Sequence, residues 1–300
     1  MPFLILVVTV AVFATPVPAR AVFPGAPGLI AFSEGGNIFT IAPDGSPPLS
    51  QLTFNGDDEN PAWAPGGQRI AFDHGGDIYV MSATGRNVRR LTFLGNSFQP
   101  AWAPGGSRIV FVHQRTFGVG GDLWTVPTTG GAPTRLTFLT RTTCEMAHPT
   151  WSPLGGRIAY EREPEDAAGQ CTIPTRVEVM RIEPRQRAFI PFARQPDFTA
   201  DGHGVFFETL NDPEGFDQNL AWSDLQGDRR QRLTSYLCAE GEPCFLEGTG
   251  SPDSAFPGAP SFAALVSHLG GTVCLVTTSS GGFCDDVVPA TPFQMDWQPI

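Results

Sequence analysis

One segment recurs along the chain and constrains its fold more than any other feature. Its best copy, residues 60–93, alternates short strand-like runs with a Pro-Gly-Gly turn at 65–67 and a Gly-Gly turn at 75–76. Later copies are anchored, like the first, on an aromatic residue; the anchors Trp63, Trp102, Trp151 and Phe198 are 39, 49 and 47 residues apart. Self-similarity at this period, with four strands in each copy, predicts the blades of a β-propeller rather than a helical solenoid.

The two ends of the chain carry complementary parts of the repeat. Residues 28–54 contain the second, third and fourth strands without a first, and residues 293–300 match a first strand and then stop. We therefore expect the C-terminal strand to pair with the N-terminal three and close a ring, which removes sheet edges that favour aggregation. The prediction is an all-β fold, a single domain over residues 22–300 built as a six-bladed β-propeller of four-stranded antiparallel blades.

The copy between residues 245 and 290 is the most degenerate. Its later strands are expected at 262–267, 272–276 and 283–288. Two positions remain open for its first strand. Residues 256–260 repeat residues 23–27 and suit the approach to a strand, whereas residues 251–254 resemble the turn that follows a first strand.

These motifs resemble the TolB-like (WD40-like) β-propeller repeat family. The shared features are a Pro-x-Trp turn, an Ile-Ala-Phe strand at 70–72, an Ile-Tyr-Val-Met strand at 78–81 and an Arg-Leu-Thr strand at 90–92. Gly66, Gly105 and Gly155 stand where the family usually has Asp, and glycine suits a turn that needs positive φ. The resemblance implies a propeller that makes protein contacts in the cell envelope.

The N-terminal residues predict export. Residues 3–14 are apolar and precede an Ala-x-Ala ending at 19–21, so residues 1–21 are expected to be a signal peptide, too short to span a bilayer. The formal net charge is −11, and an acidic surface repels phosphate backbones and anionic membranes. We expect an exported monomer, secreted or held in the periplasm or cell envelope, with no membrane insertion and no nucleic-acid partner.

Six cysteines fit an oxidising compartment. Cys144 precedes the Trp151 blade and Cys171 follows its second strand, and both positions lie on one face of a propeller. A zinc site is the alternative, but the chain lacks a Cys-x-x-Cys spacing. The positions therefore predict three disulfides, Cys144–Cys171, Cys238–Cys244 and Cys274–Cys284.

Alignment of the copies places one residue of each blade at the exit of its second strand. In a propeller such residues would ring one opening of the central funnel, where ligands usually bind. Each could instead only cap its strand or face solvent, and both interpretations stay open. The residues are Glu34, His74, His113, Arg162, Thr209 and Ser267.

Loop lengths on that face differ between blades. The connection from second to third strand is a Gly-Gly turn in the first two blades but is long at 114–121, 161–175 and 209–217. Long insertions on one face often mark the binding side of a repeat protein. Arg115, Phe117 and Phe216 lie in them and suit a protein or peptide contact, with ordinary drift in loop length as the alternative.

The recurring Trp residues and an acidic run at 57–59 could indicate a ligand cage or a calcium site, but their positions in the repeat favour structural roles. The recurring Trp residues are expected to pack between blades. Residues 57–59, Asp-Asp-Glu, lack the alternating ligand spacing of a calcium loop and are expected to form a solvated turn.

The favoured function is a non-catalytic scaffold. The chain lacks Gly-x-Ser-x-Gly and His-Glu-x-x-His motifs. We expect it to bind a protein, peptide or cell-envelope component through its loop-rich face, without a cofactor or metal. The alternative is a propeller hydrolase or lyase acting on a glycan or peptide, in which Glu34, His74, His113 and Arg162 would perform acid–base chemistry in the funnel.

Overall fold

The computed structural model of the chain describes residues 28–42, 47–116, 120–138, 144–164, 171, 175–199, 201–209, 220–232, 247–250, 263–268, 272–277, 285–288 and 294–297. For residues 220, 231, 232 and those from 247 onward, only the backbone is described. Every regular element among these residues is a β-strand. The expected signal peptide, residues 1–21, lies outside the described residues.

The strands assemble into four-stranded antiparallel sheets, most of them from one continuous stretch of sequence. From first to fourth strand, the early sheets are β4 (Asp58–Trp63), β5 (Arg69–His74), β6 (Asp77–Ser82) and β7 (Arg89–Arg90); β8 (Ser97–Trp102), β9 (Arg108–His113), β10 (Asp122–Pro127) and β11 (Thr134–Arg135); and β12 (Met146–Trp151), β13 (Arg157–Arg162), β14 (Arg176–Arg181) and β15 (Gln186–Pro191).

Two later sheets continue this order, and one further sheet joins the two ends of the chain. They are β16 (Ala193–Phe198), β17 (Gly204–Thr209), β18 (Leu220–Asp224) and β19 (Arg230–Arg232); β20 (Glu247–Gly250), β21 (Ala263–His268), β22 (Thr272–Thr277) and β23 (Asp285–Val288); and β24 (Gln294–Trp297), β1 (Ile30–Glu34), β2 (Asn37–Ile41) and β3 (Ser50–Gln51).

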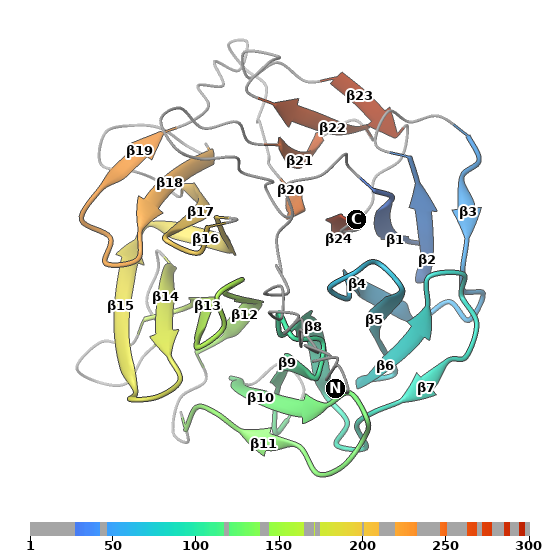
Figure 1. Cartoon of the computed structure of the whole chain (residues 1–300), viewed down its shortest axis with the longest axis horizontal. Coiled ribbons are helices and arrows are strands. Elements are labelled where there is room, and N and C mark those ends of the chain that lie inside the picture. Colours follow the sequence, from blue (N-terminus) through green and yellow to red (C-terminus); the bar gives the residue numbers. More distant parts are fainter. Residues whose placement is uncertain are drawn as a thin grey trace, which may run out of the picture.

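The sheets are arranged around a common centre, as the blades of a β-propeller are (Figure 1). The first strands, such as β4, β8 and β12, lie innermost, and the fourth strands, such as β7, β11 and β15, lie outermost. The predicted all-β fold of four-stranded antiparallel blades is therefore confirmed.

The structure defines strands at the two chain ends and at the start of the most degenerate blade. β24 pairs antiparallel with β1, with Ile30 opposite Trp297 and Ser33 opposite Gln294, so the predicted pairing of the chain ends is present. β20 ends at Gly250, directly before residues 251–254, so the first strand of that blade precedes these residues. Closure of the blades into a six-membered ring remains a prediction.

The core lies between the blades. Trp63 and Trp102 are each 5% exposed, which confirms their predicted packing role. Trp102 packs with Ile109 and Phe111 of its own blade against Ile78 of the preceding one, and its Nε1 donates to the Ala62 carbonyl at 3.0 Å. Burying a large aromatic side chain at each joint accounts for its recurrence in the repeat.

The Arg-Leu-Thr motif also has a structural cause. At the start of β6, buried Asp77 accepts hydrogen bonds from Thr92 Oγ1 at 2.8 Å and from the Leu94 amide at 2.9 Å, and it pairs with Arg90. Thr92 Oγ1 in turn accepts the Ile78 amide at 2.8 Å. These bonds tie the fourth strand to the third and satisfy polar groups that the short outer strand would otherwise leave unpaired.

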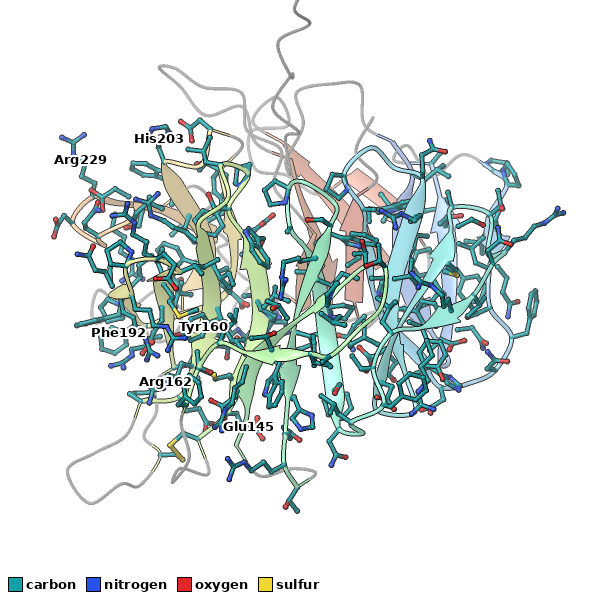
Figure 2. The ribbon with its side chains drawn as sticks, turned by 60° about the horizontal axis from the view of Figure 1, so that its bottom comes forward. Glu145, Tyr160, Arg162, Phe192, His203 and Arg229 are labelled. Carbon is teal, nitrogen blue, oxygen red and sulfur yellow. A yellow bond between two sulfur atoms is a disulfide. The ribbon has the colours of Figure 1, made fainter. Side chains whose placement is uncertain are left out.

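The Gly-Gly turns define one face of the molecule. The Ser97 amide, at the start of β8, donates to the Gly76 carbonyl at 2.8 Å, so the turn between second and third strands touches the segment leading into the next blade. Gly76 has φ 77°, and a Cβ there would lie 2.6 Å from the Asn96 amide nitrogen, so this contact requires glycine. We call this end of the sheets the loop face. Arg162 and Glu145 lie near it, and His203, in a turn between first and second strands, lies at the opposite end (Figure 2).

Candidate functional site

Each of four inner strands contains a β-bulge built on a polar residue that precedes proline. The register shifts there in β4, β8, β12 and β16, because proline donates no amide hydrogen to the ladder. The polar residue adopts a left-handed backbone, which is uncommon outside glycine. The residues are Asn60, Gln99, His148 and Gln195, with φ of 54°, 55°, 48° and 47°. The inner strands carry them towards the centre of the molecule (Figure 1).

Hydrogen bonds link these bulges from blade to blade. The Gln99 amide donates to Asp73 Oδ1 at 3.0 Å, and the Gln195 amide donates to Glu161 Oε2 at 3.3 Å. Asp73 and Glu161 are the fifth residues of β5 and β13, so the second strand of one blade holds the first strand of the next. β9 has an apolar residue at this position, and there the His148 amide donates to Gln99 Oε1 at 2.9 Å instead.

The joint between the Trp151 and Phe198 blades concentrates ionisable groups. His148 Nδ1 lies 3.1 Å from Glu161 Oε2, and the Arg194 guanidinium bonds both carboxyl oxygens of Glu208 at 2.6 and 2.7 Å. Burial acts to raise the pKa of Glu161. The hydrogen bond and charge of His148, together with the Gln195 amide and the charge of Arg194, outweigh it and hold that pKa below its usual value. Burial raises the pKa of Glu208, which is 0% exposed, although Arg194 acts against the rise.

Asp73 is the corresponding acid of the Trp63 blade, and its environment differs. Burial raises its pKa to about 8, against the hydrogen bonds from the Gln99 amide and the Asn60 side chain. The nearby carboxylates of Glu59 and Asp57 raise it further. At neutral pH this group is therefore largely a neutral carboxylic acid.

The two histidines predicted at strand exits occupy corresponding positions, but one meets a carboxylate and the other a hydroxyl. His74 Nδ1 lies 2.9 Å from Asp58 Oδ1, and His113 Nδ1 lies 3.2 Å from Ser97 Oγ, so each meets the first residue of its own inner strand. Each ring also meets a third-strand aromatic ring edge-on, with centroids 5.4 Å apart for His74 and 5.3 Å for His113. Burial lowers the pKa of His113. The expectation of a solvated turn at residues 57–59 is wrong for Asp58, which begins β4 and is fully buried.

The other exit residues do not share one environment. Glu34 is half-buried at the end of β1. Arg162 is buried at the end of β13, where its guanidinium lies 3.1 Å from Glu178. Thr209 is buried at the end of β17, and the Ser267 side chain lies outside the described part of the structure.

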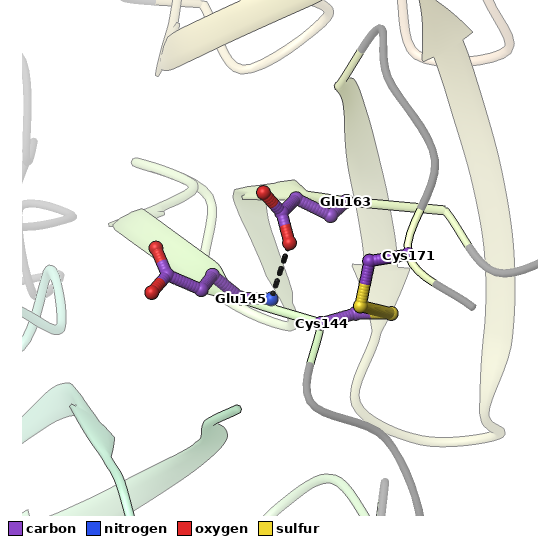
Figure 3. Close-up of a disulfide and its surroundings, with 4 residues drawn as sticks. All are labelled: Cys144, Glu145, Glu163 and Cys171. Carbon is purple, nitrogen blue, oxygen red and sulfur yellow. Dashed lines mark hydrogen bonds between the residues drawn. A yellow bond between two sulfur atoms is a disulfide. The ribbon is translucent and has the colours of Figure 1, made fainter. Parts of the chain in front are cut away.

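A disulfide braces the loop face. Cys144 and Cys171 form a disulfide with their Cα atoms 5.1 Å apart, which confirms this predicted pair (Figure 3). Beside it, the Glu145 amide donates to Glu163 Oε2 at 3.1 Å, and the Glu163 amide donates to the Glu145 carbonyl at 3.1 Å. The long connection after β13 is thus fastened to the segment that leads into its own blade.

Several predicted residues are only partly covered by the structure. Arg115 is exposed just after β9. Phe117, Phe216, Cys238, Cys244 and Cys284 lie outside the described residues. Cys274 lies in β22 with Asp286 as its backbone partner, and its predicted bond to Cys284 stays a prediction.

Sequence reasoning missed three acids near the inner-strand bulges, of which Asp73 and Glu161 link blades and Glu208 pairs with Arg194 within its own blade. Asp73, Glu161 and Glu208 each stand one residue before a predicted exit residue. Alternation along a strand points neighbouring side chains to opposite faces, so a shift of one residue exchanges the funnel position for the contact with the next blade. The polar residue before each inner-strand proline was the available signal.

The described residues also limit two other kinds of site. Over these ranges, no three His, Cys, Asp or Glu side chains are grouped so that they could hold a metal ion. Within the same part of the chain, no helical segment has the length and hydropathy needed to cross a bilayer.

Comparison with known proteins identifies the fold. No family model matches the sequence, and no curated protein matches it. Among solved structures, TolB from Acinetobacter baumannii is similar with a TM-score of 0.66 and 16% identity, covering 91% of this chain and 67% of that one. A chain of a nidogen/laminin complex has a TM-score of 0.65 and 11% identity, with coverage of 90% and 98%. An oligogalacturonate lyase in complex with manganese has a TM-score of 0.54 and 11% identity, with coverage of 84% and 70%. The chain has the fold of the TolB-like β-propellers.

Proposed function

We propose that this chain is an exported, closed six-bladed β-propeller that binds a protein, peptide or cell-envelope component through its loop face. Residues 1–21 are removed as a signal peptide, and residues 22–300 form one domain. The protein works as a monomeric scaffold without a cofactor. The pairing of β24 with β1 supports ring closure, and the disulfide supports an oxidising compartment.

The observation that carries the proposal is the bracing of the loop face. The Cys144–Cys171 disulfide restrains a long connection whose counterpart in the Trp63 blade is only Gly75-Gly76. Restraining a surface loop before binding lowers the entropy cost of ordering it on a partner. The structural neighbours include TolB and a chain of a protein complex, so this fold serves in protein assemblies elsewhere.

A loop exchange tests the proposed face. Replacing residues 114–121 with Gly-Gly converts the connection after His113 into the sequence His74-Gly75-Gly76-Asp77. The hairpin should survive, because His113 pairs with Asp122 in the same register as His74 with Asp77. Partners are first captured from an envelope and secreted fraction of the source, then purified, and their affinity for both proteins is measured by calorimetry.

The expected result is an affinity at least ~10-fold weaker for the exchanged protein, with smaller losses for Phe117→Ala and Phe216→Ala. Leu154→Ser, at an exposed turn on the opposite face, is the control and should leave affinity unchanged. Unchanged affinity after the exchange, or an equal loss in the control, would reject the loop face as the contact.

A second candidate function rests on the His148–Glu161 pair. A carboxylate on Nδ1 fixes the imidazole tautomer and leaves Nε2 to exchange a proton, as acid–base catalysis requires. A propeller hydrolase or lyase acting on a glycan or peptide would use this pair or the strand-exit residues Glu34, His74, His113 and Arg162. Turnover in hydrolysis and elimination screens that disappears in His148→Gln or His74→Gln would favour the enzyme over the scaffold.

A further inference from the structure

The joint between the Trp102 and Trp151 blades gathers arginines and exposed aromatic rings on an acidic chain. Its outer wall is formed by β11 and β15, the outermost strands of neighbouring sheets (Figure 1). Leu136, directly after β11, and Ile182, directly after β14, pack against one hydrophobic cluster, and Arg185 before β15 lies over the Phe138 ring after β11, so the two outer regions meet at this joint. We define the basic patch as Arg135, Phe138, Arg176, Arg185, Arg187 and Phe189.

Positive charge is in excess at this joint. Buried Glu178 is shared by three guanidinium groups, at 3.1 Å from Arg162, 2.6 Å from Arg176 and 3.6 Å from Arg187. Arg135 pairs with Asp122, and Arg185 adds a fifth guanidinium. Five arginines therefore face two carboxylates, whereas the whole chain has a net charge of −11. At the adjacent turn, Arg181 and Glu183 add one charge of each sign.

Exposed aromatic rings lie among these arginines. Phe138 and Phe189 are each 57% exposed. The guanidinium carbons of Arg135 and Arg185 lie 5.0 and 5.4 Å from the Phe138 ring centroid, and that of Arg176 lies 5.1 Å from the Phe189 centroid. Two like charges held at one ring repel each other, and an incoming carboxylate would relieve that repulsion while the rings lose contact with water.

β15, the strand that carries Arg187 and Phe189 of the patch, favours an extended chain as the partner. β15 has six residues, whereas the outer strands β3, β7 and β11 have two each and β19 has three. Its far end is covered, because Arg230 donates to the Pro191 carbonyl at 3.3 Å, but Gln186 and Arg187 at its near end are exposed. A strand edge offers backbone groups to another polypeptide, and a polysaccharide makes no use of such a ladder.

We propose that the basic patch is a second docking surface, on the outer wall and separate from the loop face, for an acidic protein segment that also carries aromatic side chains. Carboxylates of the segment pair with Arg185 and Arg187, since planar guanidinium groups bind carboxylates in bidentate fashion. Its aromatic side chains cover Phe138 and Phe189. The charge of the patch and its exposed rings together select a partner that is both anionic and apolar.

The test uses a defined probe and a matched control. A fluorescein-labelled peptide of alternating Glu and Phe is titrated with the full mature protein and followed by fluorescence anisotropy, with a Lys-Phe peptide for comparison. Arg185→Glu reverses the charge in the turn between β14 and β15, and Arg86→Glu does the same in the corresponding turn between β6 and β7. Both arginines are exposed, so both variants should fold.

We expect the Glu-Phe peptide to bind and the Lys-Phe peptide not to bind. Arg185→Glu should weaken binding by ~10-fold or more and Phe189→Ser by several-fold, while Arg86→Glu changes it less than ~2-fold. Equal weakening by both charge reversals, absence of Glu-Phe binding, or tighter binding of an anionic polysaccharide such as polygalacturonate would each overturn the proposal.

Discussion

Asp73 and Glu161 occupy the same position in two blades, yet the pKa values of their carboxyls shift in opposite directions. Each is the fifth residue of a second strand, and each accepts the amide of the bulge residue in the next blade. Burial acts to raise both pKa values. Two things differ. The bulge residue of the same blade is Asn60 for Asp73 but His148, which can carry a positive charge, for Glu161; and the nearby charges are the carboxylates of Glu59 and Asp57 for Asp73 but the guanidinium of Arg194 for Glu161.

The comparison shows how a repeat protein varies chemistry at constant backbone geometry. Asn60 and His148 have nearly the same left-handed backbone, with φ of 54° and 48°. We therefore expect the bulge side chain to contribute to whether the linking acid is neutral or ionised at neutral pH. The joint with His148 also borders the Arg194–Glu208 pair, so ionisable groups gather at this joint.

The largest expected effect comes from removing the positive charge of Arg194 at the joint that contains Glu161. Arg194→Ala leaves the carboxylate of Glu208 buried without its bidentate partner and should lower the free energy of unfolding by about 4 kcal/mol at pH 8. The loss should shrink towards pH 5, because burial favours the protonated form of Glu208. Urea denaturation at both pH values measures it. Arg86→Ala is the control, and a loss independent of pH would contradict the electrostatic explanation.

On the neutral side, Asp73→Asn should stabilise the protein at alkaline pH. Asp73 titrates at about 8 when folded and at 3.8 when unfolded, so the folded state binds the extra proton between these values. Wild-type stability must then fall as pH rises, by ~1.4 kcal/mol per pH unit from this group. The variant lacks that slope and should gain on the order of 3 kcal/mol relative to wild type between pH 5 and pH 7.5. Parallel stability curves for the two proteins would refute the raised pKa.

Replacing His148 with Asn should give Glu161 an environment like that of Asp73, which has Asn60 as its bulge residue. In wild type the lowered pKa of Glu161 gives stability that is present above pH 4.5 and is lost as pH falls through the folded pKa. In His148→Asn burial dominates, the pKa of Glu161 rises, and stability instead falls as pH rises above 4.5. We expect a loss of about 2 kcal/mol at pH 7.5 that disappears only as pH falls below 4.5, through the folded pKa of Glu161, measured by denaturation. A loss that grows towards low pH would show that the pair does not set this pKa.

The sequence predicted the blades more fully than the joints. Strand positions follow from the repeat, because apolar alternation, the Trp anchors and the Gly-Gly turns all act within one copy. The Cys144–Cys171 disulfide could be predicted because propeller topology puts both residues on one face. The role of the acids at the joints depends on contacts between copies. Moving by one residue along a strand moves the side chain to the other face of the sheet, so the repeat pattern pointed to His74 and not to its neighbour Asp73.

Buried polar groups show the same limit. Asp58 looked like part of an acidic turn, but it is the first residue of β4 and meets His74. Arg162 was expected to face a ligand at the strand exit, but its guanidinium forms an ion pair with Glu178 on the adjacent strand. In both cases the register between neighbouring strands decides which side chain is the partner, and the residues of the motif alone do not reveal that register.

The smallest expected effect is the reverse exchange, Asn60→His. The backbone at this position should accept histidine, because His148 adopts the same left-handed conformation before proline in another blade. A protonated imidazole beside Asp73 would favour the carboxylate and lower its pKa from about 8, as His148 does for Glu161. Stability at pH 7 should change by only about 1 kcal/mol, because the gained ion pair offsets the cost of ionising a buried acid. The informative readout is the pKa of Asp73 itself, followed by carbon-13 NMR of its carboxyl. A pKa that stays near 8 would mean that burial alone controls this joint, and that the contrast with Glu161 arises from the neighbouring Arg194 rather than from the bulge residue.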